Sequence, residues 1–313
     1  MRNISLEELL EAGCHFGHQV TRQNPKARDY IFEARDNIHI IDLEKTKEGL
    51  DTALQFVHDL AKKGGKLVIL GAKRQAQGIV REELARAQKE GVDGIYAVTN
   101  RWIGGILTNF PEVSKNFKRL KQLTDQLQDE MEKAKYTKKE ISLWEKERAK
   151  LASFYSGIAD LTEKPDALFI IDTHLENLAV REAIVTRVKT VGMTDTNADP
   201  TMVDYAIPAN DDAVGSIQLI TSTVIDAWIE GRKAAKGEEA KAAKSAEQAA
   251  KKEAVSAEQP AAVSEQKEEK KKIAKKPVKE KPRLAGDESK RAVKTVKKKI
   301  EETKETEKTV GVE

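Results

Sequence analysis

Acidic residues gather in three short segments that each follow an apolar run of this 313-residue chain. The segments are Asp172-Thr173-His174, Asp195-Thr196-Asn197-Ala198-Asp199-Pro200 and Asn210-Asp211-Asp212. Converging carboxylates could hold a magnesium ion or act as general acids and bases, which would make Asp172, His174 and Asp195 candidate residues of an enzyme for a phosphorylated substrate. The structural alternative is that these residues form turns, with Asp211 or Asp212 capping a helix that follows.

Cys14, His15 and His18 form a second group with chemical potential, because thiolates and imidazoles are zinc ligands. Structural zinc sites usually draw on two separated ligand pairs, and only the remote His39 could join this group. We therefore expect packing and hydrogen bonding around Gly17 in place of a metal, and we expect no cofactor. Since Cys14 is the only cysteine, a disulfide within the chain is excluded.

Two further segments have features of anion or nucleic-acid binding. Gly71-Ala72-Lys73-Arg74 follows an apolar run and opens a helix, but it has one glycine where a dinucleotide fingerprint needs three. That helix N-terminus could still hold a mononucleotide or an RNA phosphate. In Arg101-Trp102-Ile103-Gly104-Gly105, an arginine and an aromatic residue beside paired glycines would allow stacking and close approach to RNA. The alternative is that Trp102 anchors the next helix to the body.

The elements that must position these residues alternate between strand and helix patterns. Apolar runs predict strands at 66–71, 95–98, 167–171, 190–193 and 204–207, and amphipathic patterns predict helices at 43–62, 74–89, 178–187 and 212–234. Short strands at 30–32 and 38–41 flank a turn at Asp36-Asn37. The alternation predicts an α/β fold with a parallel sheet flanked by helices, in which residues 1–107 and 159–235 form the body.

Residues 108–158 interrupt this alternation, because they show no strand pattern. Apolar residues recur there at three- and four-residue spacing on both sides of a turn near Tyr136-Thr137. This pattern predicts an inserted antiparallel helical hairpin, a coiled coil, whose outer faces carry Lys118 and Arg119.

Residues 236–313 differ from the body in composition, because they contain no Phe, Tyr or Trp and carry 22 basic against 16 acidic residues. Such a Lys/Glu/Ala-rich segment buries too little apolar surface to offset its ordering entropy, so we expect a disordered basic tail. Residues 1–235 hold 33 basic and 36 acidic residues, which excludes a strongly basic nucleic-acid-binding domain. Because neither a membrane span nor an apolar signal region is evident, we expect a cytoplasmic protein without a membrane partner.

Six short strings of residues in this chain resemble, in the same order, strings of the bacterial small-subunit ribosomal protein two family. This family is called the S-two family below. The strings lie within about residues 1–232, and they are His15-Phe16-Gly17-His18-Gln19, Leu43-Glu44-Lys45-Thr46, Lys73-Arg74-Gln75-Ala76, Arg101-Trp102-Ile103-Gly104-Gly105-Ile106-Leu107-Thr108-Asn109, Asp195-Thr196-Asn197-Ala198-Asp199-Pro200 and Ile207-Pro208 through Asn210-Asp211-Asp212-Ala213. The resemblance implies a flavodoxin-like parallel sheet with a coiled-coil insertion. It also implies docking on small-subunit ribosomal RNA, help in recruiting the neighbouring protein S-one, a ribosome-bound location and no catalysis.

On this reading the body supplies shape, and scattered cations supply phosphate contacts to ribosomal RNA. The expected RNA-binding residues are Arg22, Lys26, Arg28, Lys73, Arg74, Arg101, Trp102, Lys118 and Arg119. One alternative is a nucleotide- or sugar-phosphate-binding α/β enzyme. Another is a scaffold whose hairpin and tail bind proteins and not RNA. We expect neither a catalytic residue nor a small-molecule substrate.

Overall fold

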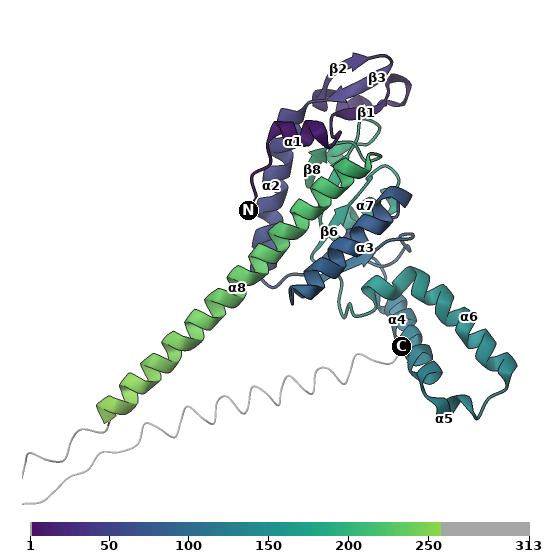
Figure 1. The fold of residues 1–313 in the computed structure, drawn as a ribbon, viewed down its shortest axis with the longest axis vertical. Coiled ribbons are helices and arrows are strands. Elements are labelled where there is room, and N and C mark those ends of the chain that lie inside the picture. Colours follow the sequence, from purple (N-terminus) through teal and green to yellow (C-terminus); the bar gives the residue numbers. More distant parts are fainter. Residues whose placement is uncertain (1, 258–313) are drawn as a thin grey trace, which may run out of the picture. The chain divides into compact units, whose positions relative to one another are not determined.

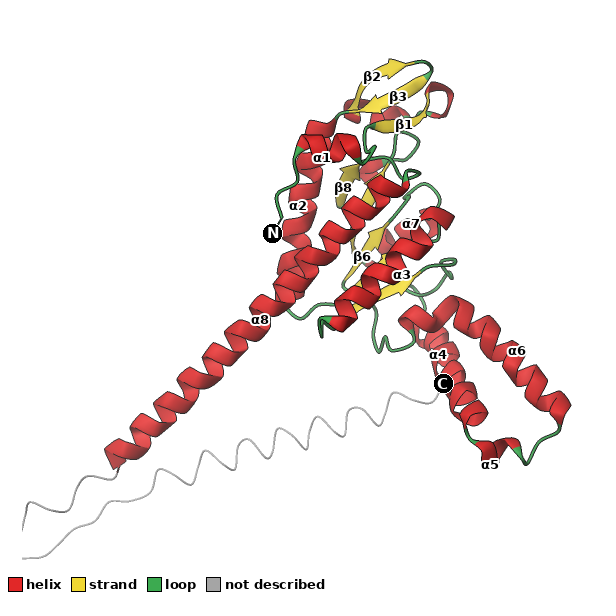
Figure 2. Cartoon of the chain, in the orientation of Figure 1, coloured by secondary structure: helices red, strands yellow, loops and turns green. Residues whose placement is uncertain are grey.

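A five-stranded parallel sheet forms the centre of the protein in the computed structural model, which describes residues 2–257 (Figures 1 and 2). The strand order is β5-β4-β6-β7-β8, and every neighbouring pair is parallel. Relative to the chain, this is the order 2-1-3-4-5 of flavodoxin-like sheets, so the expected topology is confirmed. The strands are β4 (Leu67–Leu70), β5 (Ile95–Val98), β6 (Ala167–Ile170), β7 (Lys189–Thr194) and β8 (Tyr205–Pro208).

Both faces of the sheet are covered, because side chains alternate between two apolar cores. Leu67 and Ile69 of β4 pack into one core with residues of three helices, α2 (Leu43–Lys62), α3 (Arg74–Lys89) and α8 (Val214–Ala257). Val68 and Leu70 pack on the opposite face, with helix α7 (Asn177–Thr186) and part of the inserted helices. This double coverage explains why the runs around β4 and β6 are continuously apolar.

A second, three-stranded antiparallel sheet follows the first helix, α1 (Leu6–Glu11). It consists of β1 (Phe16–Gln19), β2 (Ile31–Arg35) and β3 (Ile38–Ile41), in the order β1-β3-β2. The predicted turn between β2 and β3 is confirmed, since Asp36 and Asn37 both have positive φ, as a two-residue hairpin requires. The short 3-10 helices Val20–Arg22 and Pro25–Tyr30 join β1 to β2.

The insertion holds three helices, α4 (Phe110–Gln128), the short α5 (Glu130–Lys133) and α6 (Lys138–Tyr155). Helix α4 ends earlier than predicted because Asp129 Oδ1 accepts a hydrogen bond from the Met131 backbone, which starts a new turn. Met131 continues the three- and four-residue apolar spacing of this segment, but it is 81% exposed, so the apolar stripe predicted from that spacing does not extend to it. Helices α4 and α6 contact each other, whereas the coiled coil stays a prediction.

Helix α8 continues to Ala257, beyond the end predicted near Ala234. Its extension falls in an Ala-, Lys- and Glu-rich stretch, whose residues are strong helix formers. The remainder of the predicted tail, 258–313, lies outside the described residues. Within residues 2–257, every helix is too short or too polar to cross a membrane.

Candidate nucleic-acid interface at the sheet edge

Loops that leave the carboxyl ends of four parallel strands meet at one polar cluster, as the sequence predicted for the acidic segments. The ammonium group of Lys73, after β4, lies at the centre of an ion network. Its Nζ is 3.0 Å from Asp172 Oδ2, 2.8 Å from Asp211 Oδ1 and 2.7 Å from Asp212 Oδ1. Asp172 adopts a left-handed backbone (φ 69°), and its Oδ1 accepts from the Leu175 backbone, which closes the turn into α7.

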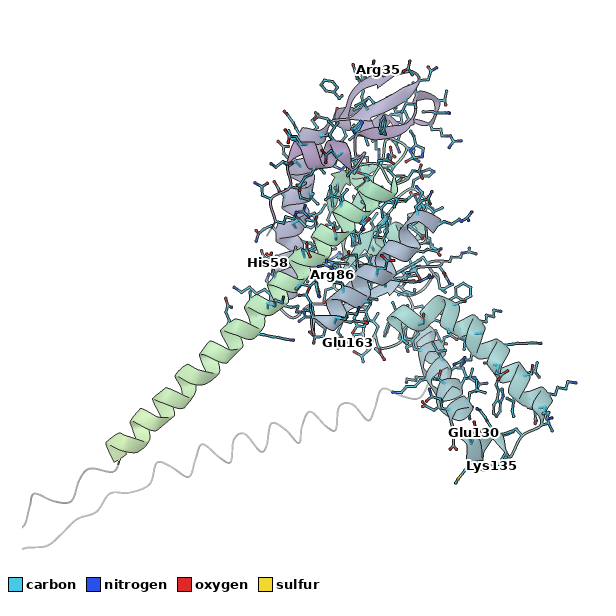
Figure 3. All side chains as sticks on the ribbon, viewed as in Figure 1. Arg35, His58, Arg86, Glu130, Lys135 and Glu163 are labelled. Carbon is cyan, nitrogen blue, oxygen red and sulfur yellow. The ribbon has the colours of Figure 1, made fainter. Side chains whose placement is uncertain are left out.

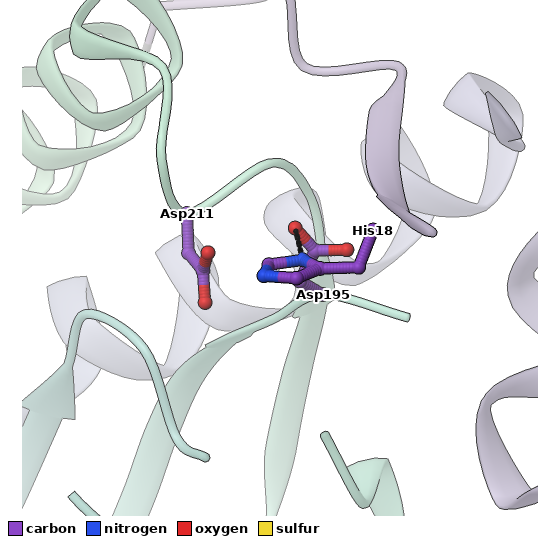
Figure 4. Close-up of side chains that lie close together, drawn as sticks. All are labelled: His18, Asp195 and Asp211. Carbon is purple, nitrogen blue, oxygen red and sulfur yellow. Dashed lines mark ion pairs between the residues drawn. The ribbon is translucent and has the colours of Figure 1, made fainter. Parts of the chain in front are cut away.

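His18 of β1 joins this cluster from the N-terminal sheet (Figure 4). Its Nδ1 is 2.9 Å from Asp195 Oδ2, and its Nε2 is 3.5 Å from Asp212 Oδ2. The His18 backbone N–H also donates to Thr196 Oγ1 at 2.9 Å. These contacts connect the two sheets through charged groups, an arrangement the sequence did not reveal because His18 and Asp195 are remote in the chain.

Burial and charge both shift the ionisation of this cluster. Burial, reinforced by the charges of Asp172 and Asp195, raises the pKa of Asp211 to about 7, although Lys73 opposes the shift. Burial would lower the pKa of Lys73, but its carboxylate partners outweigh burial and raise it. The contact with Asp195 raises the pKa of His18. The carboxylates of the cluster therefore raise the pKa of both Lys73 and His18.

The group of Cys14, His15 and His18 does not converge on one point. Cys14 is fully buried in the apolar core, where burial raises the pKa of its thiol. His18 instead contacts carboxylates from the loops after β7 and β8. The zinc alternative considered for these three residues therefore lacks the geometry it needs.

Glu182 of α7 is a buried carboxylate whose role the sequence analysis missed. It accepts five hydrogen bonds from the loop that leads to the insertion. The donors are Trp102 Nε1 (3.3 Å), Gly105 N (2.8 Å), Leu107 N (3.2 Å), Thr108 N (3.3 Å) and Thr108 Oγ1 (3.2 Å). Gly105 has φ +99°, a conformation that favours glycine. The glycines therefore serve the internal geometry of this loop.

Two of the expected RNA-binding residues are corrected by this geometry. Trp102 is only 2% exposed and its indole N–H donates to Glu182, so the ring anchors the loop and is not free to stack on a base. The Lys73 side chain is 15% exposed, and its ammonium is already bound by three carboxylates. Both residues therefore act within the protein.

The other expected residues lie at or near the surface. Lys26 pairs with Asp199 (2.7 Å), and Arg119 forms two hydrogen bonds of 2.9 Å with Glu147. The remaining five are exposed and form no ion pair within the described part of the chain, and they are Arg22, Arg28, Arg74, Arg101 and Lys118.

The enzyme alternative finds little support at this edge. A narrow hollow beside the cluster, lined by residues that include Ala27, Thr194 and Asp195, has no room for a water molecule. Ligand pockets usually span roughly 300–1,000 Å³. Asp172 and Asp211 are held in ion pairs with Lys73, and His174, a proposed reacting group, is exposed.

Glu176, which precedes α7, gives the edge a testable pH dependence. Burial first, then the charge of Asp172, raise the pKa of Glu176 from 4.5 to about 7, while Arg101 acts in the opposite direction. Because the folded pKa is raised, ionised Glu176 destabilises the fold increasingly as the pH rises from 4.5 to about 7. We expect Glu176→Gln to raise the free energy of unfolding by about 1–3 kcal/mol at pH 8. At pH 4.5 it should change little, and urea unfolding at both pH values measures the difference.

The fold and the sheet edge together define a class of α/β protein. The acidic residues at the carboxyl edge of its sheet form ion pairs within the protein, and exposed Arg side chains lie around that edge. A family model described as ribosomal protein S2 matches residues 9–231, which is more than half of the chain. The chain therefore belongs to the ribosomal protein S2 family, as the resemblance indicated. Its class is that of structural, non-enzymatic proteins of the small ribosomal subunit.

Proposed function

We propose that this protein binds small-subunit ribosomal RNA through exposed cations of its N-terminal sheet region and of the carboxyl edge of its large sheet. The observation that carries the proposal is that Arg22, Arg28, Arg74 and Arg101 are exposed and unpaired within residues 2–257. A surface cation without a protein partner is available to a phosphate, and phosphate contacts supply most of the affinity for RNA.

The N-terminal sheet adds an exposed aromatic group to these cations. Phe32 of β2 is 72% exposed, and Arg35 projects from the same strand at the outer end of the hairpin (Figure 3). Arginine planes and aromatic rings both stack on unpaired bases. These two exposed side chains of one strand support a site for an RNA loop or bulge beside the phosphate contacts.

The segment that carries Arg22, Lys26 and Arg28 is held against the large sheet. The Asn24 backbone donates to the Thr196 carbonyl at 2.8 Å, and Lys26 Nζ is 2.7 Å from Asp199 Oδ2. Fixed side chains lose less conformational entropy when they bind, so this anchoring supports a preformed contact surface.

Replacing Arg22, Arg28 and Arg101 together with alanine should weaken incorporation of the protein into small subunits. Each lost phosphate contact reduces the slope of log affinity against log salt by about 0.7–0.9, so the triple variant should lose roughly 2–3 in slope. Filter binding to small-subunit ribosomal RNA across a salt series measures the slope, and sedimentation of tagged protein measures incorporation.

A matched control removes three exposed lysines, Lys63, Lys89 and Lys164, each of which precedes a strand at the amino edge of the sheet. The control has the same net charge as the test variant. If both variants had equal salt slopes, the effect would be one of net charge, and the proposed surface would be wrong.

We further propose that residues 108–158 form a coiled-coil arm and that the ribosome-bound protein helps to recruit protein S-one in the cytoplasm. Contacts between α4 and α6 support an arm, and exposed Met131 and Leu143 give it apolar surface for a protein partner. Capture of S-one by the full chain after nuclease treatment tests the recruitment. Capture lost with nuclease would assign the contact to RNA.

A further inference from the structure

The polar cluster at the sheet edge carries more negative than positive charge. Four carboxylates, those of Asp172, Asp195, Asp211 and Asp212, lie around Lys73 and His18. The first three belong to buried residues. Buried charges are stable only when they are compensated, and Lys73 supplies a single positive charge. A further cation would therefore reduce the excess negative charge of the cluster.

Two buried carboxylate oxygens of the cluster, Asp195 Oδ2 and Asp211 Oδ2, have no hydrogen-bond partner within the described residues. Asp211 is fully buried, and its Oδ1 binds Lys73 at 2.8 Å, whereas its Oδ2 is unpartnered. Figure 4 shows the Asp211 carboxylate facing the imidazole of His18. Donor atoms of His18, Asp195 and Asp211 all lie within 4.8 Å of one another. An unpartnered buried carboxylate oxygen that faces an imidazole is an observation that points to a ligand.

The His18 ring is already oriented for metal binding. Asp195 Oδ2 lies 2.9 Å from Nδ1, while Nε2 points toward Asp211 and is 3.5 Å from Asp212 Oδ2 (Figure 4). Metal-binding histidines usually have a carboxylate beside their other ring nitrogen, which restrains the ring. Asp195 Oδ2 supplies that carboxylate as an ion pair without a hydrogen bond.

We propose that His18 Nε2, Asp211 and Asp212 bind a divalent transition-metal ion such as Zn²⁺, with Asp195 orienting the imidazole. Imidazole nitrogen and carboxylate oxygen together suit zinc. Ligands at about 2 Å from Zn²⁺ lie at most about 4 Å apart, and His18 Nε2 is already 3.5 Å from Asp212 Oδ2. The ion and Lys73 together leave one negative charge, which the half-exposed Asp212 shares with solvent.

The ion would connect strand β1 to the loops after β7 and β8. It would thereby fix the N-terminal sheet, and the segment with Arg22, Lys26 and Arg28, to the large sheet. This inference goes beyond the proposed RNA binding, which does not require a metal.

The test is calorimetric titration of the full-length, chelator-stripped protein with Zn²⁺. We expect one stoichiometric site, and we expect His18→Gln and Asp211→Asn each to weaken it by more than about 10-fold. His58→Gln is the matched control, since His58 Nδ1 lies 3.3 Å from Asp59 on the surface of α2 and such a pair could bind zinc adventitiously. Binding by this control should equal that of the wild type.

Thermal unfolding gives a second readout, because an ion that binds only the folded state raises the melting temperature. Zn²⁺ should raise it for the wild type and His58→Gln and leave His18→Gln unchanged. The absorption spectrum of the Co²⁺ complex tests the site in the wild type alone. A spectrum without a thiolate band supports the proposed site. A thiolate band would assign the ion to Cys14 and overturn the proposal. The proposal also fails if the wild type has no stoichiometric site, or if the folded variants bind zinc like the wild type. In either case, a protonated His18, and not a metal ion, would compensate the negative charge of these carboxylates.

Discussion

Replacing Glu182 with alanine should lower the free energy of unfolding by about 3–5 kcal/mol, because it removes the acceptor of a whole loop. Five hydrogen bonds from residues 102–108 end on this one carboxylate. Trp102, Leu107 and Glu182 are buried, so water cannot easily replace the lost acceptor. Unsatisfied buried donors are among the few causes of so large an effect.

Urea denaturation of the full chain, followed by tryptophan fluorescence, measures this loss, since Trp102 is a direct reporter. Glu182→Gln should be less harmful than alanine, because its remaining carbonyl oxygen still accepts while its amide NH₂ faces the other donors. Glu163→Ala, at an exposed site, is the control for the loss of one carboxylate. A loss below about 1 kcal/mol in Glu182→Ala would mean that the loop holds its shape without the carboxylate.

Local patterns predicted most of the fold correctly. The buried strands β4 and β6 were visible as apolar runs, and the turn at Asp36-Asn37 was visible because these residue types tolerate positive φ. The turn predicted near Tyr136-Thr137 is confirmed, since Thr137 and Glu140 form a capping box at the start of α6. Strand β1 was missed because its residues, Phe16–Gln19, are partly exposed and lack an alternating pattern. Its pairing with β3 is a tertiary contact that no local signal reports.

The polar edge was predicted only in part, because charge partners lie far apart in the sequence. Parallel strands bring their carboxyl ends to one edge, so the convergence of Asp172, Asp195 and Asp211 could be predicted. The ion pairs of Lys73 with two of these carboxylates could not be predicted, and Lys73 was therefore assigned to RNA.

Glu182 had a signal that could have been used. It lies on the same face of α7 as Ala179 and Ala183, both fully buried. A carboxylate among buried positions of a helix must have partners, and the nearest unexplained donors were the backbone N–H groups of a glycine-rich loop.

Lys73→Met should have the second large effect, and its pH dependence identifies the cause. The substitution leaves Asp172 and Asp211 buried without their ammonium partner, which should lower the free energy of unfolding by about 3–5 kcal/mol at pH 8. In the wild type the pKa of Lys73 is raised, so its stabilising contribution is fully present throughout the acid and neutral range. The pH dependence of the difference in unfolding free energy between Lys73→Met and the wild type therefore comes from the carboxylates of the variant.

Without Lys73, these carboxylates take up protons more readily in the folded state than in the unfolded state. A carboxylate with a raised folded pKa destabilises the protein increasingly as the pH rises above its unfolded value of about 4. The difference between variant and wild type should therefore be small near pH 5 and largest at pH 8. Urea unfolding at both pH values, with a chelator present to exclude any bound ion, measures it. Lys89→Met, at the exposed end of the same helix, controls for the loss of a charge from α3. An equal loss at both pH values would show that Lys73 stabilises the edge by packing of its aliphatic stem, and the electrostatic explanation of this cluster would have to be abandoned.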